Sequence, residues 1–110
     1  MAVDKRLEEL LELVVREGGS DLHISALGPP MLRVSGALIP ISKYKAFTDE
    51  ETSAMLKSIV PPDRWNSFQE SQAIDLSYAH KADARFRING YKAQGATSLA
   101  LRLVPRDIHN

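Results

Sequence analysis

Strict alternation of polar and apolar residues in the last third of the chain most constrains its fold. Within residues 84–93, Phe86 faces one side of an extended backbone and Arg87 faces the other. Similar patterns over residues 73–79 and 96–104 predict two further strands. Alternation over three successive segments requires a sheet that is buried on one face and polar on the other, so this region predicts antiparallel strands joined by hairpins.

The first seventy residues predict three helices and a second group of short strands. Helices are expected at about residues 3–17, from residue 48 up to the prolines at 61–62, and over residues 62–70, with strands at 21–25, 31–34 and 38–41. Thr48 and Glu51 form a capping box at the start of the second helix. This order predicts an α+β domain: a mainly antiparallel sheet of about six strands with three helices packed on it.

Composition limits the classes of function. With 110 residues the chain builds one domain, and with no cysteine it forms no disulfide and no thiolate metal site. The net charge of +0 predicts neither a nucleic-acid partner nor attraction to an anionic membrane. No apolar run approaches the roughly 20 residues of a membrane helix, so we expect a cytoplasmic protein without direct membrane insertion. Residues 81–110 hold six Lys or Arg against two Asp, so any anion-binding surface should come from this part.

The turn between the last two predicted strands sets the position of three arginines. If Gln94–Gly95 is a two-residue turn, Arg87 lies opposite Arg102, with Arg85 beside them and Asp75 near Arg87. A solvated polar face with one ion pair is the simplest interpretation, and a protein interface is another. The third is that the arginines converge on an external anion such as a phosphate, for which the guanidinium fork is suited.

Other polar residues suggest no catalysis within this chain. His23, His80 and His109 are far apart in sequence, so no metal site is expected. Asp21 and His23 share one face of a strand, and we expect a structural hydrogen-bonded pair there. A hydrolase would need a cleft that joins them to a serine. The sequence has no G-x-x-x-x-G-K-[ST] phosphate loop, so no nucleotide pocket and no ATP hydrolysis are expected from this chain alone.

Five blocks of the sequence, spread over residues 3–105, resemble the N-terminal region of type IV pilus retraction (twitching motility) ATPases of the secretion ATPase superfamily. The blocks are GGSDLHIS at 18–25, PPMLRVSG at 29–36, AIDLSY at 73–78, RFRIN at 85–89 and LRLVP at 101–105. They occur in the family's order and at similar spacing.

The resemblance implies a hexameric ATPase whose N-terminal domain is PAS-like and whose RecA-like domain binds ATP and Mg. It implies a PAS-like domain at residues 1–104, the start of an interdomain linker at 105–110, and a RecA-like domain that this chain lacks. The arginines matching those that reach the γ-phosphate of ATP are Arg85, Arg87 and Arg102, while Asp21, His23 and Asp75 would be structural or interdomain residues.

The same resemblance implies a regulatory, nucleotide-sensing role. The partners would be a RecA-like domain of the same or a neighbouring subunit, the other subunits of a homohexamer, and the pilus base machinery. The parent protein would work in the cytoplasm at the inner face of the inner membrane.

Two departures from the family pattern are Gln94, where many members have arginine, and Ala73, where the family has glutamate. Related type II secretion and pilus-assembly ATPases are the nearest alternative, although they read SDIHIE where this chain ends its block in Ser25. An alternative of another class is a stand-alone PAS-like sensor or protein-interaction module.

Overall fold

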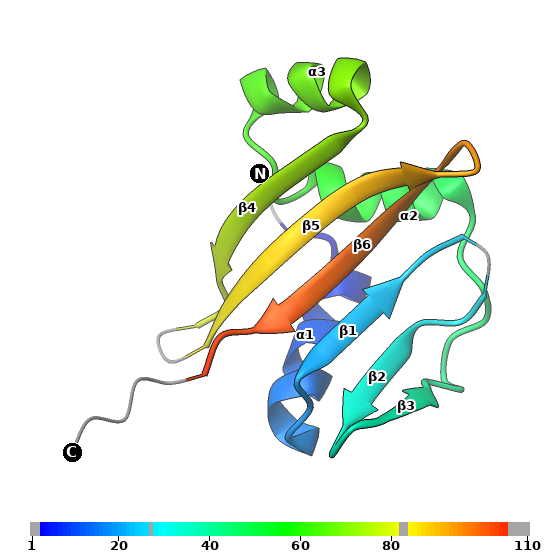
Figure 1. Ribbon diagram of the computed structural model, residues 1–110, viewed down its shortest axis with the longest axis vertical. Coiled ribbons are helices and arrows are strands. Elements are labelled where there is room, and N and C mark those ends of the chain that lie inside the picture. The colour runs from blue at the N-terminus through cyan, green and yellow to red at the C-terminus, as the bar shows by residue number, and fades with distance from the viewer. Residues whose placement is uncertain (1–2, 27, 82–83, 106–110) are drawn as a thin grey trace.

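The computed structural model describes residues 3–26, 28–81 and 84–105 (Figure 1). Its elements are α1 (Lys5–Glu17), β1 (Asp21–Ile24), β2 (Met31–Val34), β3 (Ala37–Pro40), α2 (Asp49–Lys57), α3 (Pro62–Ser71), β4 (Ala73–Ala79), β5 (Arg85–Ala93) and β6 (Ala96–Leu103). The predicted α+β class and element order are confirmed. The second helix ends earlier than expected, at Lys57, four residues before the first proline.

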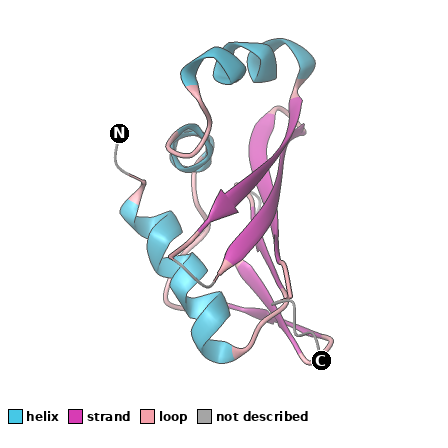
Figure 2. Cartoon of the chain, turned by 90° about the vertical axis from the view of Figure 1, so that its left-hand side faces the viewer, coloured by secondary structure: helices cyan, strands magenta, loops and turns pink. Residues whose placement is uncertain are grey.

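All strands belong to one antiparallel sheet of six strands in the order β3-β2-β1-β6-β5-β4. The last strand, β6, therefore lies between β5 and the first strand, β1 (Figure 1). The helices lie on one side of the sheet, and in the described part of the chain no helix covers the other side (Figure 2). We call that uncovered side the open face.

The covered face of the sheet and the helices enclose one hydrophobic core. Fully buried side chains come from α1, α2, α3 and the central strands, and the largest include Phe68, Phe86, Leu11, Leu22, Met55, Leu56, Ile88 and Leu101. Helix α1 presents its predicted apolar stripe, with Asp4 capping its start by accepting from the Arg6 amide at 2.9 Å. Gly18, in the left-handed conformation, ends it.

Local turn chemistry fixes the β5–β6 hairpin. Gln94 and Gly95 have φ angles of 53° and 80°, as expected for the two-residue turn whose twist matches that of paired strands. The predicted pairing of Arg87 with Arg102 is confirmed by this register. The sequence analysis thus placed the arginine pair correctly because a one-residue slip would have buried both side chains.

Close packing at Gly90 joins β5 to α2. A Cβ atom built on Gly90 would lie 2.6 Å from Leu56 Cδ2 and 3.1 Å from Ile74 Cγ2. Both contacts are shorter than normal van der Waals separations, and Leu56 is fully buried. Glycine at this position therefore permits the helix to approach the sheet.

A buried histidine ties α1 to the end of β4. His80 is only 3% exposed, and its Nε2 lies 3.0 Å from Glu12 Oε1. Lys81 Nζ lies 2.8 Å from the same oxygen. The hydrogen bond with Lys81, and then that with His80, lowers the pKa of Glu12 to about 2.

Replacing Gly90 by alanine should destabilise the domain. Because the added methyl group must displace buried side chains, we expect G90A to lower the free energy of unfolding by about 1–3 kcal/mol. Urea denaturation measures the change. The matched control is G28A, since a Cβ on Gly28 meets no atom within 4 Å. Equal midpoints for G90A and G28A would contradict the close packing.

Stability should depend on Glu12 in a pH-dependent way. Its pKa falls from 4.5 to about 2 on folding, so its stabilisation is present above about pH 4.5 and is lost as the pH falls towards 2. We expect E12Q to lower the urea midpoint at pH 7 and to have a smaller effect at pH 3. The control is E70Q, which changes an exposed glutamate of α3 with no ion pair among the described residues. A cost of E12Q that is the same at both pH values would be the contrary result.

Candidate functional site

Cross-strand pairing on the open face collects charged residues into one row. The register places Asp21 opposite both Arg33 and Arg102, Arg102 opposite Arg87, and Arg87 opposite Ser77. The row therefore crosses five strands, from β2 to β4, and we call it the arginine row. Three of its five members are arginines, and residues far apart in sequence meet in it only through the β1–β6 pairing.

Asp21 binds two of these arginines. Its Oδ1 lies 3.2 Å from Arg102 Nε, and its Oδ2 lies 3.4 Å from Arg33 Nε. Ser20 also donates its hydroxyl to Oδ2 at 3.1 Å. The side chain of Asp21 is 16% exposed, whereas that of Arg102 is 74% exposed. One carboxylate thus serves two cations, and the Arg102 end of the contact is open to solvent.

Arg87 has no such partner. It is exposed, and no hydrogen bond or ion pair joins its side chain to any of the described residues. Arg85, two residues away on the same face, donates from Nη1 to Ser77 Oγ at 3.2 Å. The facing pair of Arg87 and Arg102 costs the sheet a fraction of a kcal/mol, about 0.2–1 on the scale for like charges directly opposite. An external anion would relieve that repulsion.

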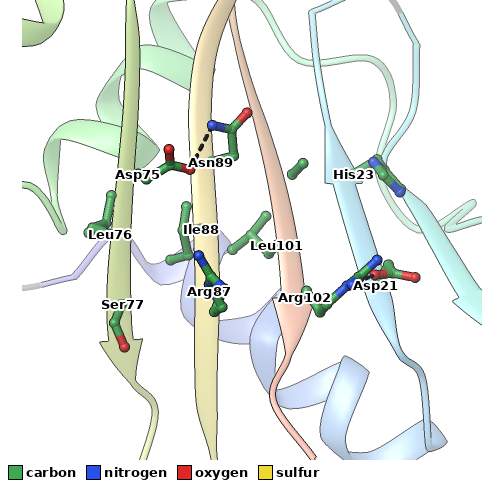
Figure 3. Close-up of a pocket in the computed structure, with 11 residues that line it drawn as sticks. Asp21, His23, Asp75, Leu76, Ser77, Arg87, Ile88, Asn89, Leu101 and Arg102 are labelled. Carbon is green, nitrogen blue, oxygen red and sulfur yellow. Dashed lines mark hydrogen bonds and ion pairs between the residues drawn. The ribbon is translucent and has the colours of Figure 1, made fainter.

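The predicted position of Asp75 beside Arg87 is wrong. Asp75 lies opposite Asn89 and accepts from Asn89 Nδ2 at 2.9 Å, while Ser77 lies opposite Arg87 (Figure 3). The β4–β5 register differs by two residues from the expected one. A shift of two keeps every side chain on its own face, so polar–apolar alternation cannot distinguish the two registers.

The expected hydrogen bond between Asp21 and His23 is also absent from the described residues. Asp21 bonds instead to the arginines and Ser20, and His23 points away from it along the strand (Figure 3). Ser77 is three strand spacings from His23, about 14 Å, so these two side chains form no hydrogen bond with each other. No group of three or more metal-ligating side chains occurs within residues 3–26, 28–81 and 84–105.

A hollow of about 470 Å³ lies on the open face beside the arginine row. Ala100 lies at its centre because this small residue falls between His23 and Asn89 in the next row. Arg87 and Arg102 line one end (Figure 3). The arrangement offers two guanidinium groups to an anion, and Asp21, His23, Asp75 and Ser77 line the same hollow.

Sequence reasoning missed Arg33. The residue alternates with Leu32 and Val34 in the predicted hairpin, a pattern that already placed it on the polar face. What the sequence did not show is that β2 and β6 flank the same strand, so that Arg33 and Arg102 share Asp21. The two predicted residues Arg87 and Arg102 lie directly opposite each other on neighbouring strands.

The described helices contain none that is long and apolar enough to cross a membrane. No protein-family model matches the chain, but individual proteins are similar to it. The chain is 28% identical over 101 residues to the type IV pilus ATPase PilU of Pseudomonas aeruginosa, and 29% identical over 102 residues to the type IV pilus retraction ATPase PilT of the same organism. These matches cover 92% and 93% of this chain but only 26% and 29% of the relatives. The chain therefore spans a little over a quarter of their length.

Solved structures show the same relationship. The crystal structure of the pilus retraction motor PilT with bound ADP matches 93% of this chain with a TM-score of 0.82 and 26% identity, and the match spans 30% of that chain. The Legionella pneumophila ATPase DotB has the same fold, with a TM-score of 0.78 and 23% identity over 94% of this chain and 29% of its own. The chain is thus homologous to the N-terminal region of the PilT and PilU type IV pilus ATPases, and it shares its fold with PilT and DotB.

Proposed function

We propose that this chain is the nucleotide-sensing N-terminal domain of a hexameric pilus-retraction ATPase that powers twitching motility. Its open face receives the γ-phosphate of an ATP molecule, with Mg, held by a RecA-like domain of the same or a neighbouring subunit. Hydrolysis takes place in that second domain, in the cytoplasm at the inner face of the inner membrane. The energy of hydrolysis drives pilus disassembly through the pilus base machinery.

The observation that most supports this proposal is that Arg87 is exposed, faces Arg102 and has no hydrogen bond or ion pair to the described residues. Two guanidinium groups on neighbouring strands present several donors to one side of a phosphoryl group. Their Cα atoms are about 4.5–5.5 Å apart in such a pair, so both side chains can reach one anion. Arg85 lies on the same face and is the third candidate contact.

The rest of the ATP site must come from another domain. Since the sequence has no phosphate loop, this face can hold only the outer end of a nucleotide that is already bound elsewhere. Arginines in that position stabilise negative charge that develops during hydrolysis, and they report whether a γ-phosphate is present. Because its contacts with the nucleotide differ between the ATP and ADP states, the domain then moves as a rigid body when the nucleotide state changes.

In the ATPase that carries this domain, R87A and R102A should each reduce ATP turnover. Because each removes a donor to the developing phosphoryl charge, we expect kcat to fall roughly 10- to 100-fold. Steady-state hydrolysis measures the effect, and thermal unfolding checks that both variants keep the fold. The matched control is R16A, which removes an exposed arginine of α1 on the covered side. If R87A and R102A both hydrolyse ATP as fast as R16A, the proposed role is wrong.

The isolated 110-residue chain should neither hydrolyse ATP nor bind it tightly. Two or three surface arginines without a phosphate loop supply little preorganisation, so we expect a Kd above about 1 mM. Isothermal titration calorimetry and a phosphate-release assay measure both properties. Micromolar binding, or turnover that survives further purification, would show that a nucleotide site exists within this chain.

A further inference from the structure

Asp21 is the least exposed charged group of the arginine row, and it divides its two oxygens between two arginines of different exposure. We propose that Asp21 is a built-in counter-ion that occupies Arg102 while the site is empty, and that a phosphoryl anion binds by replacing Asp21 at Arg102. This inference rests on the proposed function, because it assigns the regulation of that same site.

The two arginines that face each other make different contacts. Arg102 extends from β6 towards Asp21 on β1, away from Arg87 (Figure 3). Arg87 keeps its donors free of any described residue. An incoming anion therefore meets Arg87 first, and it gains the second guanidinium only when the Arg102–Asp21 contact opens.

That contact can open at small cost. Ion pairs with a solvent-exposed cation are weak, and the Arg102 side chain is 74% exposed. Asp21 does not become an isolated carboxylate when Arg102 leaves, because Arg33 and the Ser20 hydroxyl still bind its Oδ2. Arg33 is the better anchored partner, since its Nη1 also donates to the Gly36 carbonyl oxygen at 3.0 Å and its side chain is 39% exposed.

The exchange sets the affinity of the face for anions. With Asp21 present, binding must break one ion pair and place the anion near a carboxylate. The variant D21N keeps the shape of the side chain but removes both penalties, so we expect the affinity for a phosphoryl anion to rise about three- to tenfold.

The test titrates inorganic tripolyphosphate into the 110-residue chain, at constant ionic strength, while the arginine Nε–Hε signals of Arg87 and Arg102 are followed by NMR. In the wild type we expect the Nε–Hε signals of both arginines to shift as the anion is added. The Arg87 signal shifts because Arg87 binds the anion, and the Arg102 signal shifts because Arg102 leaves Asp21. In D21N the Arg102 signal should already be shifted before any anion is added, because its partner has lost its charge. The dissociation constant should then be about three- to tenfold lower than in the wild type.

Two further variants separate an exchange at Arg102 from a general effect of charge. D75N neutralises the other aspartate of the open face, whose carboxylate bonds to Asn89 and to no arginine side chain among the described residues, so it should change the affinity less than twofold. In an R102A background the gain from D21N should fall below twofold, since no Arg102 remains to be released and only the repulsion between the anion and the carboxylate is relieved.

The outcomes distinguish this proposal from the proposed function. If both arginines respond to tripolyphosphate and D21N binds no more tightly than the wild type or D75N, the counter-ion role is wrong, while the phosphate contact stands. If neither arginine responds even in D21N, the counter-ion role is also wrong, and the γ-phosphate contact loses its support. A gain from D21N that stays above twofold in R102A would likewise overturn the proposal, because Asp21 would then act without Arg102.

Discussion

Pairing between β5 and β6 is the interaction on which the rest of this domain depends. The same register that puts Ile88 opposite Leu101 in the core puts Arg87 opposite Arg102 on the open face. A single strand register therefore determines both the core packing and the positions of the arginines, since a slip of one residue would bury cations and expose leucines. The large cost of that slip is what allows two like charges to remain directly opposite each other on a stable sheet.

The β1–β6 pairing extends this constraint across the molecule. Next to the arginine row, on the covered face, lies a row that is apolar on every strand from β3 to β4: Ile39, Leu32, Leu22, Leu101, Ile88 and Leu76. Its central members are buried under α1 and α2. Because Asp21 and Arg102 adjoin the buried pair of Leu22 and Leu101 in this row, the sheet fixes the backbone positions of both residues, whereas the Arg102 side chain is exposed. A rigid backbone with an exposed side-chain contact is a suitable basis for a site that must change partners.

Sequence patterns predicted what local rules decide. The capping box at Thr48, the left-handed end of α1 and the Gln94–Gly95 turn all formed as expected, and the turn was enough to place Arg87 against Arg102. The failures are nonlocal. The β4–β5 register differs by two residues, which alternation cannot detect. The meeting of β1 with β6 joins residues some eighty positions apart, and no turn between them specifies it, so the link from Asp21 to Arg102 could not be predicted. Burial of His80 against α1 has the same origin.

The two-residue difference in β4 has a chemical consequence. In the expected register Asp75 would have neutralised Arg87, and with Asp21 on Arg102 each cation of the facing pair would have had its own carboxylate. In the observed register Ser77 takes that place, and its hydroxyl already accepts from Arg85. Arg87 is thus left without a hydrogen bond or ion pair to the described residues, while the Asp75 carboxylate accepts from Asn89. Under the proposed function, Arg87 is the cation that an incoming phosphoryl group meets at once, and Arg102 is the one that it gains by exchange.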